Sequence, residues 1–290
     1  MLWSRKRRQV PAQPVAGEVI AAAPLPMALD AGLFQHHFER LLASVRQDAG
    51  GIEAYLAALN AKSHRIDSAL APNAPPGLAE IEGLLAGVFT ARRRLYPTLE
   101  ALGAQRVGTL VHELVYGNAV MARRLQNFVD AMPGTAGMSR AEIKAAAKLR
   151  RAAWDFAAEL LHFRDPRRFP LMTRWVWDAG TQSGALRELI RGSDTLREIP
   201  FDNSPELFEG ARRWLAERIA ERGIYRDEPL WIDLLLAQAY TTYFRSMAEG
   251  GLGADFGRGV TPQEQLKKLL GIDAAPAGRT RVKKAAMSTG

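Results

Sequence analysis

The sequence predicts an all-α fold of about eight helices, in one large helical bundle or two fused ones, with disordered basic tails. Three observations lead to this fold class. Apolar residues recur at helical spacing over most of the 290-residue chain. Several of these stretches begin with a capping residue and end at a glycine or proline. No stretch alternates β-branched residues, and no Asn-Gly or Asp-Gly turn is present, so strands are not expected.

Four helices are expected in the N-terminal helical half, residues 29–132. Asp30 can cap the first helix, which gathers its apolar side chains on one face. The loop APNAPPG at 71–77 separates the second helix from the third, which Pro97 closes. No proline interrupts the fourth helix, which is therefore the longest, and PGTAG at 133–137 ends it. The expected helices cover residues 30–47, 51–70, 78–96 and 98–132.

Four more helices are expected in the C-terminal helical half, residues 139–272. Ser139 and Glu142 fit a capping box before an apolar periodic run. Pro205 suits the first helical position after a Ser204 cap, and the last helix repeats that pattern. The expected helices cover residues 139–163, 204–222, 229–244 and 261–270, and the expected disordered tails are 1–28 and 273–290.

Composition narrows the class of protein. Hydrophobic residues make up 47% of the chain, which is enough for a sizeable core. There is no cysteine, which excludes disulfides and thiolate chemistry and suits a reducing cytoplasm. The most apolar stretch, 229–244, is shorter than the roughly 20 residues that cross a bilayer and contains Asp233. We therefore expect a buried core helix there, no transmembrane segment and a cytoplasmic protein.

The net charge of +8 is unevenly distributed. Each tail contributes +3, which leaves +2 for residues 29–272. A nucleic-acid-binding domain usually carries its positive charge on the folded face, so this distribution argues for weak contacts through the tails. The candidate residues for such contacts with nucleic acid or an anionic surface are Arg5, Lys6, Arg7, Arg8, Arg279, Arg281, Lys283 and Lys284.

Glu159 and His162 are candidate metal ligands. Their i, i+3 spacing places both on one helical face, as in the Glu-x-x-His motif of carboxylate-bridged di-iron bundles. Such sites need a second motif of this kind, and none occurs here. The alternative, which we favour, is a solvated polar stripe with ion pairs along one helix face. That stripe would consist of Lys148, Arg151, Asp155, Glu159 and His162.

Other catalytic and cofactor motifs are weak. No Gly-x-Ser-x-Gly motif is present. The glycine-rich segment GGLGADFGRG at 250–259 follows a helix instead of a strand and contains no phosphate-binding lysine. We interpret it as a linker, and no cofactor is expected.

The segment LHFRDPRRFPLMTRWVWD at 161–178 combines aromatic side chains with arginines. It is either a structural corner between helices or a surface for a partner, since Trp and Arg are frequent hot-spot residues. Trp175 follows Leu171 and Met172 at helical spacing, so we expect it to be buried. Trp177 is expected at the rim. The candidate partner-binding residues are Arg164, Arg167, Arg168, Arg174 and Trp177.

Part of this segment, LLHFRDPRRFPL, resembles a Leu-x-His-Phe-x-x-Pro-x-x-Phe-Pro phrase of helical proteins related to the helix-hairpin-helix DNA glycosylases. The resemblance covers about twelve residues. In those proteins an aspartate commonly follows the final proline closely, whereas here the next aspartate is Asp178. The chain also lacks a glycine-rich helix-hairpin-helix loop, so no site residue is transferred from that group.

The function expected from these observations is that of a non-enzymatic cytoplasmic accessory or adaptor protein, which binds another protein through its helical faces. One alternative is a nucleic-acid-associated protein that uses the basic tails and the Arg/Trp-rich corner. A second alternative is a helical metalloprotein or enzyme built on Glu159 and His162.

Overall fold

The computed structural model describes residues 19–134, 137–249 and 260–273. Within these residues the chain forms ten α-helices, two short 3-10 helices and no β-strand, which confirms the all-α prediction. The helices are α1 (Ala31–Val45), α2 (Gly51–Ala69), α3 (Leu78–Ala86), α4 (Tyr96–Leu102), α5 (Ala104–Tyr116), α6 (Met121–Asp130), α7 (Arg140–Arg164), η1 (Ala185–Leu189), η2 (Ser193–Thr195), α8 (Pro205–Ala220), α9 (Glu228–Glu249) and α10 (Pro262–Leu269).

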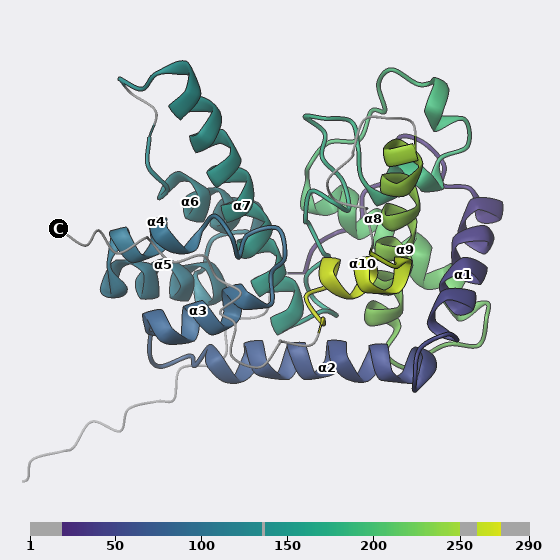
Figure 1. Cartoon of the computed structure of the whole chain (residues 1–290), viewed down its shortest axis with the longest axis horizontal. Helices are drawn as coiled ribbons and strands as arrows, with labels where there is room; N and C mark the ends of the chain where they lie inside the picture. Colours follow the sequence, from purple (N-terminus) through teal and green to yellow (C-terminus); the bar gives the residue numbers. More distant parts are fainter. Residues whose placement is uncertain (1–18, 135–136, 250–259, 274–290) are drawn as a thin grey trace, which may run out of the picture.

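The helices form two groups that α2 connects (Figure 1). One group contains α3 to α7, and the other contains α1, α8, α9 and α10. Helix α2 runs along the base of both groups and contacts α7 in the first and α9 in the second. The grouping in space differs from the division expected along the chain at 133–137, because α1 packs against α9 and η1. The buried apolar residues of both groups form one continuous cluster.

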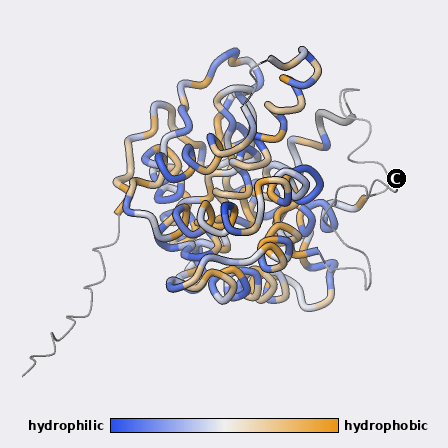
Figure 2. Tube along the Cα trace, turned by 90° about the vertical axis from the view of Figure 1, so that its left-hand side faces the viewer, coloured by the Kyte–Doolittle hydropathy of each residue, from blue (hydrophilic) through white to orange (hydrophobic). Residues whose placement is uncertain are grey.

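The helix starts expected from the sequence are confirmed where a side chain caps the helix. Asp30 Oδ1 accepts a hydrogen bond from the backbone N–H of Leu33 at 2.9 Å. Ser139 and Thr261 each form the complete capping box, and Ser204 caps α8. Each cap satisfies a backbone N–H that the first turn of a helix leaves without an intrahelical partner. Hydrophobic and hydrophilic residues are interspersed along the helices, as expected when each helix turns one side to the core (Figure 2).

The long helix expected at 98–132 is wrong, and three helices, α4, α5 and α6, occupy that region. Gly103 has φ +84° between α4 and α5, a left-handed conformation that glycine adopts without steric cost. Residues 117–120 separate α5 from α6. The third expected helix also ends early, at Ala86, and Pro97 lies in the first turn of α4 instead of closing the preceding helix. The described part of the chain therefore contains ten α-helices where eight were expected.

Part of the segment expected as a disordered N-terminal tail belongs to the folded unit. Residues 1–18 lie outside the described residues, but residues 19–28 are described, and this segment contacts α8 at Ala23 and Leu25. Ile20 is buried, and the backbone N–H of Ala23 donates to the carbonyl oxygen of Glu206 at 2.9 Å. The chain approaches α8 so closely here that a Cβ on Gly210 would lie 2.3 Å from the Ala23 oxygen.

The described helices include none that is long and apolar enough to cross a membrane.

Candidate functional site

The segment 165–178 folds back along α7. Asp165 follows the last residue of the helix, and its carboxylate accepts a hydrogen bond from the backbone N–H of Arg168 at 3.2 Å. The indole N–H of Trp154, on α7, donates to the carbonyl oxygen of Met172 at 2.8 Å. Phe169 and Leu171 are buried. Pro166 and Pro170 prevent α7 from continuing, and the chain after the helix packs back against α7.

Trp177 is fully buried, so the expectation that it lies at a partner-binding rim is wrong. Its exposed fraction is 1%, and its indole N–H donates to the carbonyl oxygen of Phe201 at 3.2 Å. Trp175 is also buried, as expected, and lies beside Tyr240 of α9. Residues 173–177 form a turn instead of a helix, and their carbonyls accept hydrogen bonds from the start of η1. The two tryptophans of this segment are therefore covered by other parts of the fold, Trp175 by α9 and Trp177 by the chain around Phe201.

The four arginines of the stretch 161–178 do not form one surface. Arg174 pairs with Asp155 and with Asp178, each at 3.3 Å. Arg164 lies over the ring of Tyr116, and Arg168 lies over the ring of Phe169. Arg167 is the most exposed of the four. The other three serve contacts inside the fold, which leaves little of the expected partner surface.

Two sets of residues singled out in the sequence lie outside the described residues. One is the segment 250–259. The other is the set of eight tail residues proposed for nucleic acid: Arg5, Lys6, Arg7, Arg8, Arg279, Arg281, Lys283 and Lys284.

The polar stripe expected on the solvent side of α7 is buried over its second half. Lys148 and Arg151 are exposed, whereas Asp155, Glu159 and His162 are each at most 1% exposed. The reason is tertiary, because α2 packs along α7 and α9 contributes Asp233 to the same region. A periodic polar face identifies one side of a helix but does not indicate whether another element covers that side.

Lys62 of α2 and Glu159 of α7 form a buried ion pair at 2.5 Å. The Lys62 ammonium also donates to the carbonyl oxygen of Leu270 at 2.7 Å and lies 3.9 Å from the centre of the Phe163 ring. Burial raises the pKa of Glu159 to about 7, although Lys62 opposes this shift. Burial likewise lowers the pKa of Lys62. The pair joins α2, α7 and the end of α10.

His162 uses both ring nitrogens inside the protein. Nδ1 lies 2.8 Å from the carbonyl oxygen of Phe169, so this nitrogen carries a proton. Nε2 lies 2.9 Å from Oδ2 of Asp233, which places the imidazole and the carboxylate within hydrogen-bond distance. Glu159 and His162 therefore face different partners and do not converge on a common ligand position. Within the described residues, no group of three or more His, Asp or Glu side chains is arranged to hold a metal ion.

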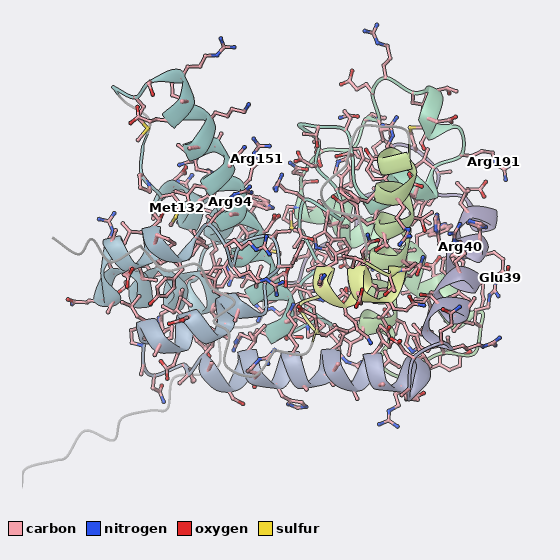
Figure 3. The ribbon with its side chains drawn as sticks, viewed as in Figure 1. Glu39, Arg40, Arg94, Met132, Arg151 and Arg191 are labelled. Carbon is pink, nitrogen blue, oxygen red and sulfur yellow. The ribbon has the colours of Figure 1, made fainter. Side chains whose placement is uncertain are left out.

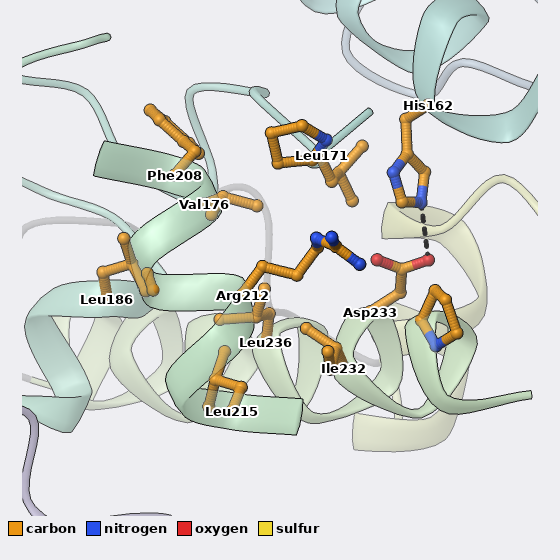
Figure 4. A pocket seen from close by; sticks show the side chains of 13 residues that line it. His162, Leu171, Val176, Leu186, Phe208, Arg212, Leu215, Ile232, Asp233 and Leu236 are labelled. Atoms are coloured by element: carbon orange, nitrogen blue, oxygen red, sulfur yellow. Dashed lines mark hydrogen bonds and ion pairs between the residues drawn. The ribbon is translucent and has the colours of Figure 1, made fainter. Parts of the chain in front are cut away.

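A small cavity adjoins the His162–Asp233 pair (Figure 4). Its walls are mainly apolar side chains of α8 and α9 and of the segment 170–176. Arg212 points toward Asp233, and its guanidinium pairs with Glu209 through two contacts of 2.7 Å. The space open to the centre of a water molecule is about 20 Å³, which is room for roughly one water. The cavity is therefore too small for an organic substrate.

A larger and more open groove lies between the start of α4 and the N-terminal turns of α7, and we call it the α4–α7 groove. About 490 Å³ of it is open to the centres of water molecules. Arg93 and Arg94, in the segment before α4, line one side, and Lys148 lines the other. The single acidic lining residue is Glu142, whose carboxylate accepts hydrogen bonds from the N–H and hydroxyl of Ser139. The apolar floor consists of Pro97, Pro133, Met138, Ala145, Ala146 and Leu149.

The N-terminal turns of α7 rise beyond α4, α5 and α6 (Figure 1). Residues 140–145 are all exposed, and Ile143 is exposed by 46%. Four exposed cations follow this part of the helix at spacings of four, four and three residues, which places them on one face. We call this set the basic stripe: Arg140, Lys144, Lys148 and Arg151. Figure 3 labels Arg151 on α7, Arg94 before α4 and Met132 after α6.

Sequence reasoning missed both the groove and the buried pairs. The run of three arginines at 92–94 is a visible signal for one side of the groove, but the apolar spacing predicts a helix through this region. For Lys62 no sequence signal exists, because its partner lies 97 positions away. Comparison of the chain with protein-family profiles, curated protein sequences and solved structures gave no match.

Proposed function

We propose that this chain is a non-enzymatic cytoplasmic accessory or adaptor protein that binds another protein through helical faces. The observation that carries the proposal is the α4–α7 groove, which combines an apolar floor, exposed cations and a helix end that packs little against the rest of the fold. Grooves with an apolar floor and a polar rim are common docking sites for partner segments. The absence of cysteine suits the cytoplasm.

The distribution of chemically capable side chains also favours this proposal over an enzyme. Lys62, Glu159, His162 and Asp233 are buried and paired with one another. The cavity next to them has room for roughly one water molecule. Such an arrangement suits the joining of helices α2, α7 and α9 better than the turnover of a substrate.

A second candidate function is association with nucleic acid, and the basic stripe is the observation that favours it. Cations spaced along one exposed helix can contact phosphates, and the basic ends of the chain would add to the attraction. Among the described residues that line the groove beside the stripe, none is aromatic and could stack on a base, which favours a protein partner over a single-stranded nucleic acid.

Site-specific photocrosslinking in the native host tests the proposal. A photoreactive residue at Ala145, in the groove, should give a discrete protein adduct that survives nuclease treatment. The same residue at the exposed Ala61 of α2 is the matched control and should not give that adduct. An adduct that nuclease removes would support the second candidate instead. Identical adducts from both positions, or none from Ala145, would argue against a docking role for the groove.

A further inference from the structure

The chemistry of the α4–α7 groove and its basic stripe indicates what kind of segment would bind there. We infer that the partner segment is an acidic amphipathic helix, which places its apolar face on the groove floor and its carboxylates against the cations on the rim. This inference rests on the proposed function, and it names the partner of the same site.

The charged side chains on the rim of the groove are almost all positive. Arg93 and Arg94 are exposed on one side of the groove, and Lys148 is exposed on the other. Within the described residues, none of these three side chains pairs with a carboxylate. Glu142, the acidic residue of the lining, is already engaged by the capping box. An acidic ligand would therefore meet unpaired cations on both sides.

The basic stripe matches the length of a short helix. From Arg140 to Arg151 the stripe spans eleven steps of about 1.5 Å, or about 16 Å along α7. A partner helix of about three turns, with Asp or Glu at i, i+4 and i+7, would present carboxylates at the same intervals. Lys148 belongs to both the stripe and the groove lining, so the stripe meets the apolar floor at this residue.

The floor favours an apolar helix face over a nucleic acid. Met138 and Leu149 supply flexible aliphatic surface, and Ala145 and Ala146 allow another helix to approach α7 closely. Methionine-containing grooves adapt well to apolar helix anchors. An aliphatic floor offers no stacking surface for bases and would remain exposed under a phosphate backbone. Binding of one of the chain's own ends in the groove is disfavoured, because each end carries a net charge of +3 and the cations on the rim would repel it.

The experiment is a selection from an unbiased displayed library of random 16-residue peptides against the full-length protein. The enriched peptides should carry Asp or Glu on one helical face and Leu, Ile, Phe or Met on the other. Fluorescence anisotropy with a synthetic consensus peptide should give a Kd that rises at least tenfold in the double variant Lys144→Glu/Lys148→Glu and in Leu149→Glu. The control Arg40→Glu/Arg213→Glu makes the same change of charge at exposed positions on α1 and α8 and should bind like the parent.

Several results would overturn the inference: enrichment of basic or non-amphipathic peptides, equal binding by the groove variants, or tighter binding of a 20-nucleotide DNA or RNA than of the consensus peptide. Circular dichroism checks that each variant remains helical. Failure here is distinguishable from failure of the proposed function. If photocrosslinking from Ala145 captures a native protein while acidic helices do not bind, the docking role stands and the partner chemistry is different.

Discussion

Lys62 and Glu159 have almost no contact with solvent, and each compensates the charge of the other. Removal of one partner leaves a buried charge alone, whereas an apolar pair can fill the same space without that penalty. We expect Lys62→Met to lower the free energy of unfolding by about 3–5 kcal/mol. The double variant Lys62→Met/Glu159→Leu should recover most of the loss. Urea unfolding at pH 7 measures both, and a double variant no more stable than Lys62→Met would contradict this account.

Trp175 and Trp177 are both core residues, so both should matter for stability. We expect Trp175→Ala and Trp177→Ala each to lower the free energy of unfolding by about 3–5 kcal/mol, because each leaves a large cavity. Trp177→Phe should lose less, since it keeps an aromatic ring and gives up the hydrogen bond to Phe201. Thermal and urea unfolding provide the test. A Trp177→Ala variant as stable as the parent would restore the rim position that the sequence suggested.

His37 makes stability depend on pH. Burial lowers its pKa from 6.5 to about 4, so between these values the unfolded chain binds a proton that the folded protein does not. Stability is therefore complete above pH 6.5 and is lost as the pH falls toward 4, by about 3 kcal/mol from this residue. His37→Gln should remove that part of the pH dependence. His64→Gln, at an exposed position, should keep the parent's pH dependence in urea unfolding measured from pH 7 to pH 4.

At the scale of the elements, the end of α10 is held closely against the segment that follows α3. Gly271 ends α10 with φ +67°, and a Cβ there would lie 1.7 Å from the carbonyl oxygen of Gly87. Gly223, after α8, has a similar φ of +74° but nothing within 4 Å of such a Cβ. The two glycines therefore separate the effect of backbone conformation from that of packing.

We expect Gly223→Ala to lower the free energy of unfolding by about 1–2 kcal/mol, the usual cost of a left-handed conformation. Gly271→Ala should lower it by clearly more, because the chain must also move away from Gly87. This displacement would disturb the carbonyl of Leu270, to which Lys62 donates. Chemical unfolding of the two variants side by side is the measurement. Equal losses would show that the close contact at Gly271 relaxes without cost.

At the scale of the whole molecule, the segment 19–28 packs against α8, which lies far from it in the sequence. Deletion of residues 1–18 should leave the melting temperature unchanged, as expected for a tail. Deletion of residues 1–28 removes the buried Ile20 and the hydrogen bond from Ala23 to Glu206, and should lower the free energy of unfolding by at least about 2 kcal/mol. Calorimetry of the two truncated proteins measures the difference. A stable 29–290 protein would show that this segment adds nothing to the fold.

The sequence by itself determined the helical class and those helix starts of this protein that a side chain caps. Capping residues such as Ser139 and Thr261 act within one turn, and the apolar spacing of a helix is local, so both can be predicted without knowledge of the fold. The burial of Trp175 was predicted correctly, but the helical spacing that predicted it is not formed, because residues 173–177 form a turn.

Only the tertiary structure decided which polar residues are buried and where the exposed surfaces lie. Asp155, Glu159 and His162 follow a pattern typical of a solvated face, and they are buried because α2 and α9 supply Lys62 and Asp233 from distant parts of the chain. The α4–α7 groove likewise arises where residues 93–98 meet residues 138–149. Burial and pairing are sums over contacts between elements, and a periodic pattern in one helix contains no information about the element that covers it.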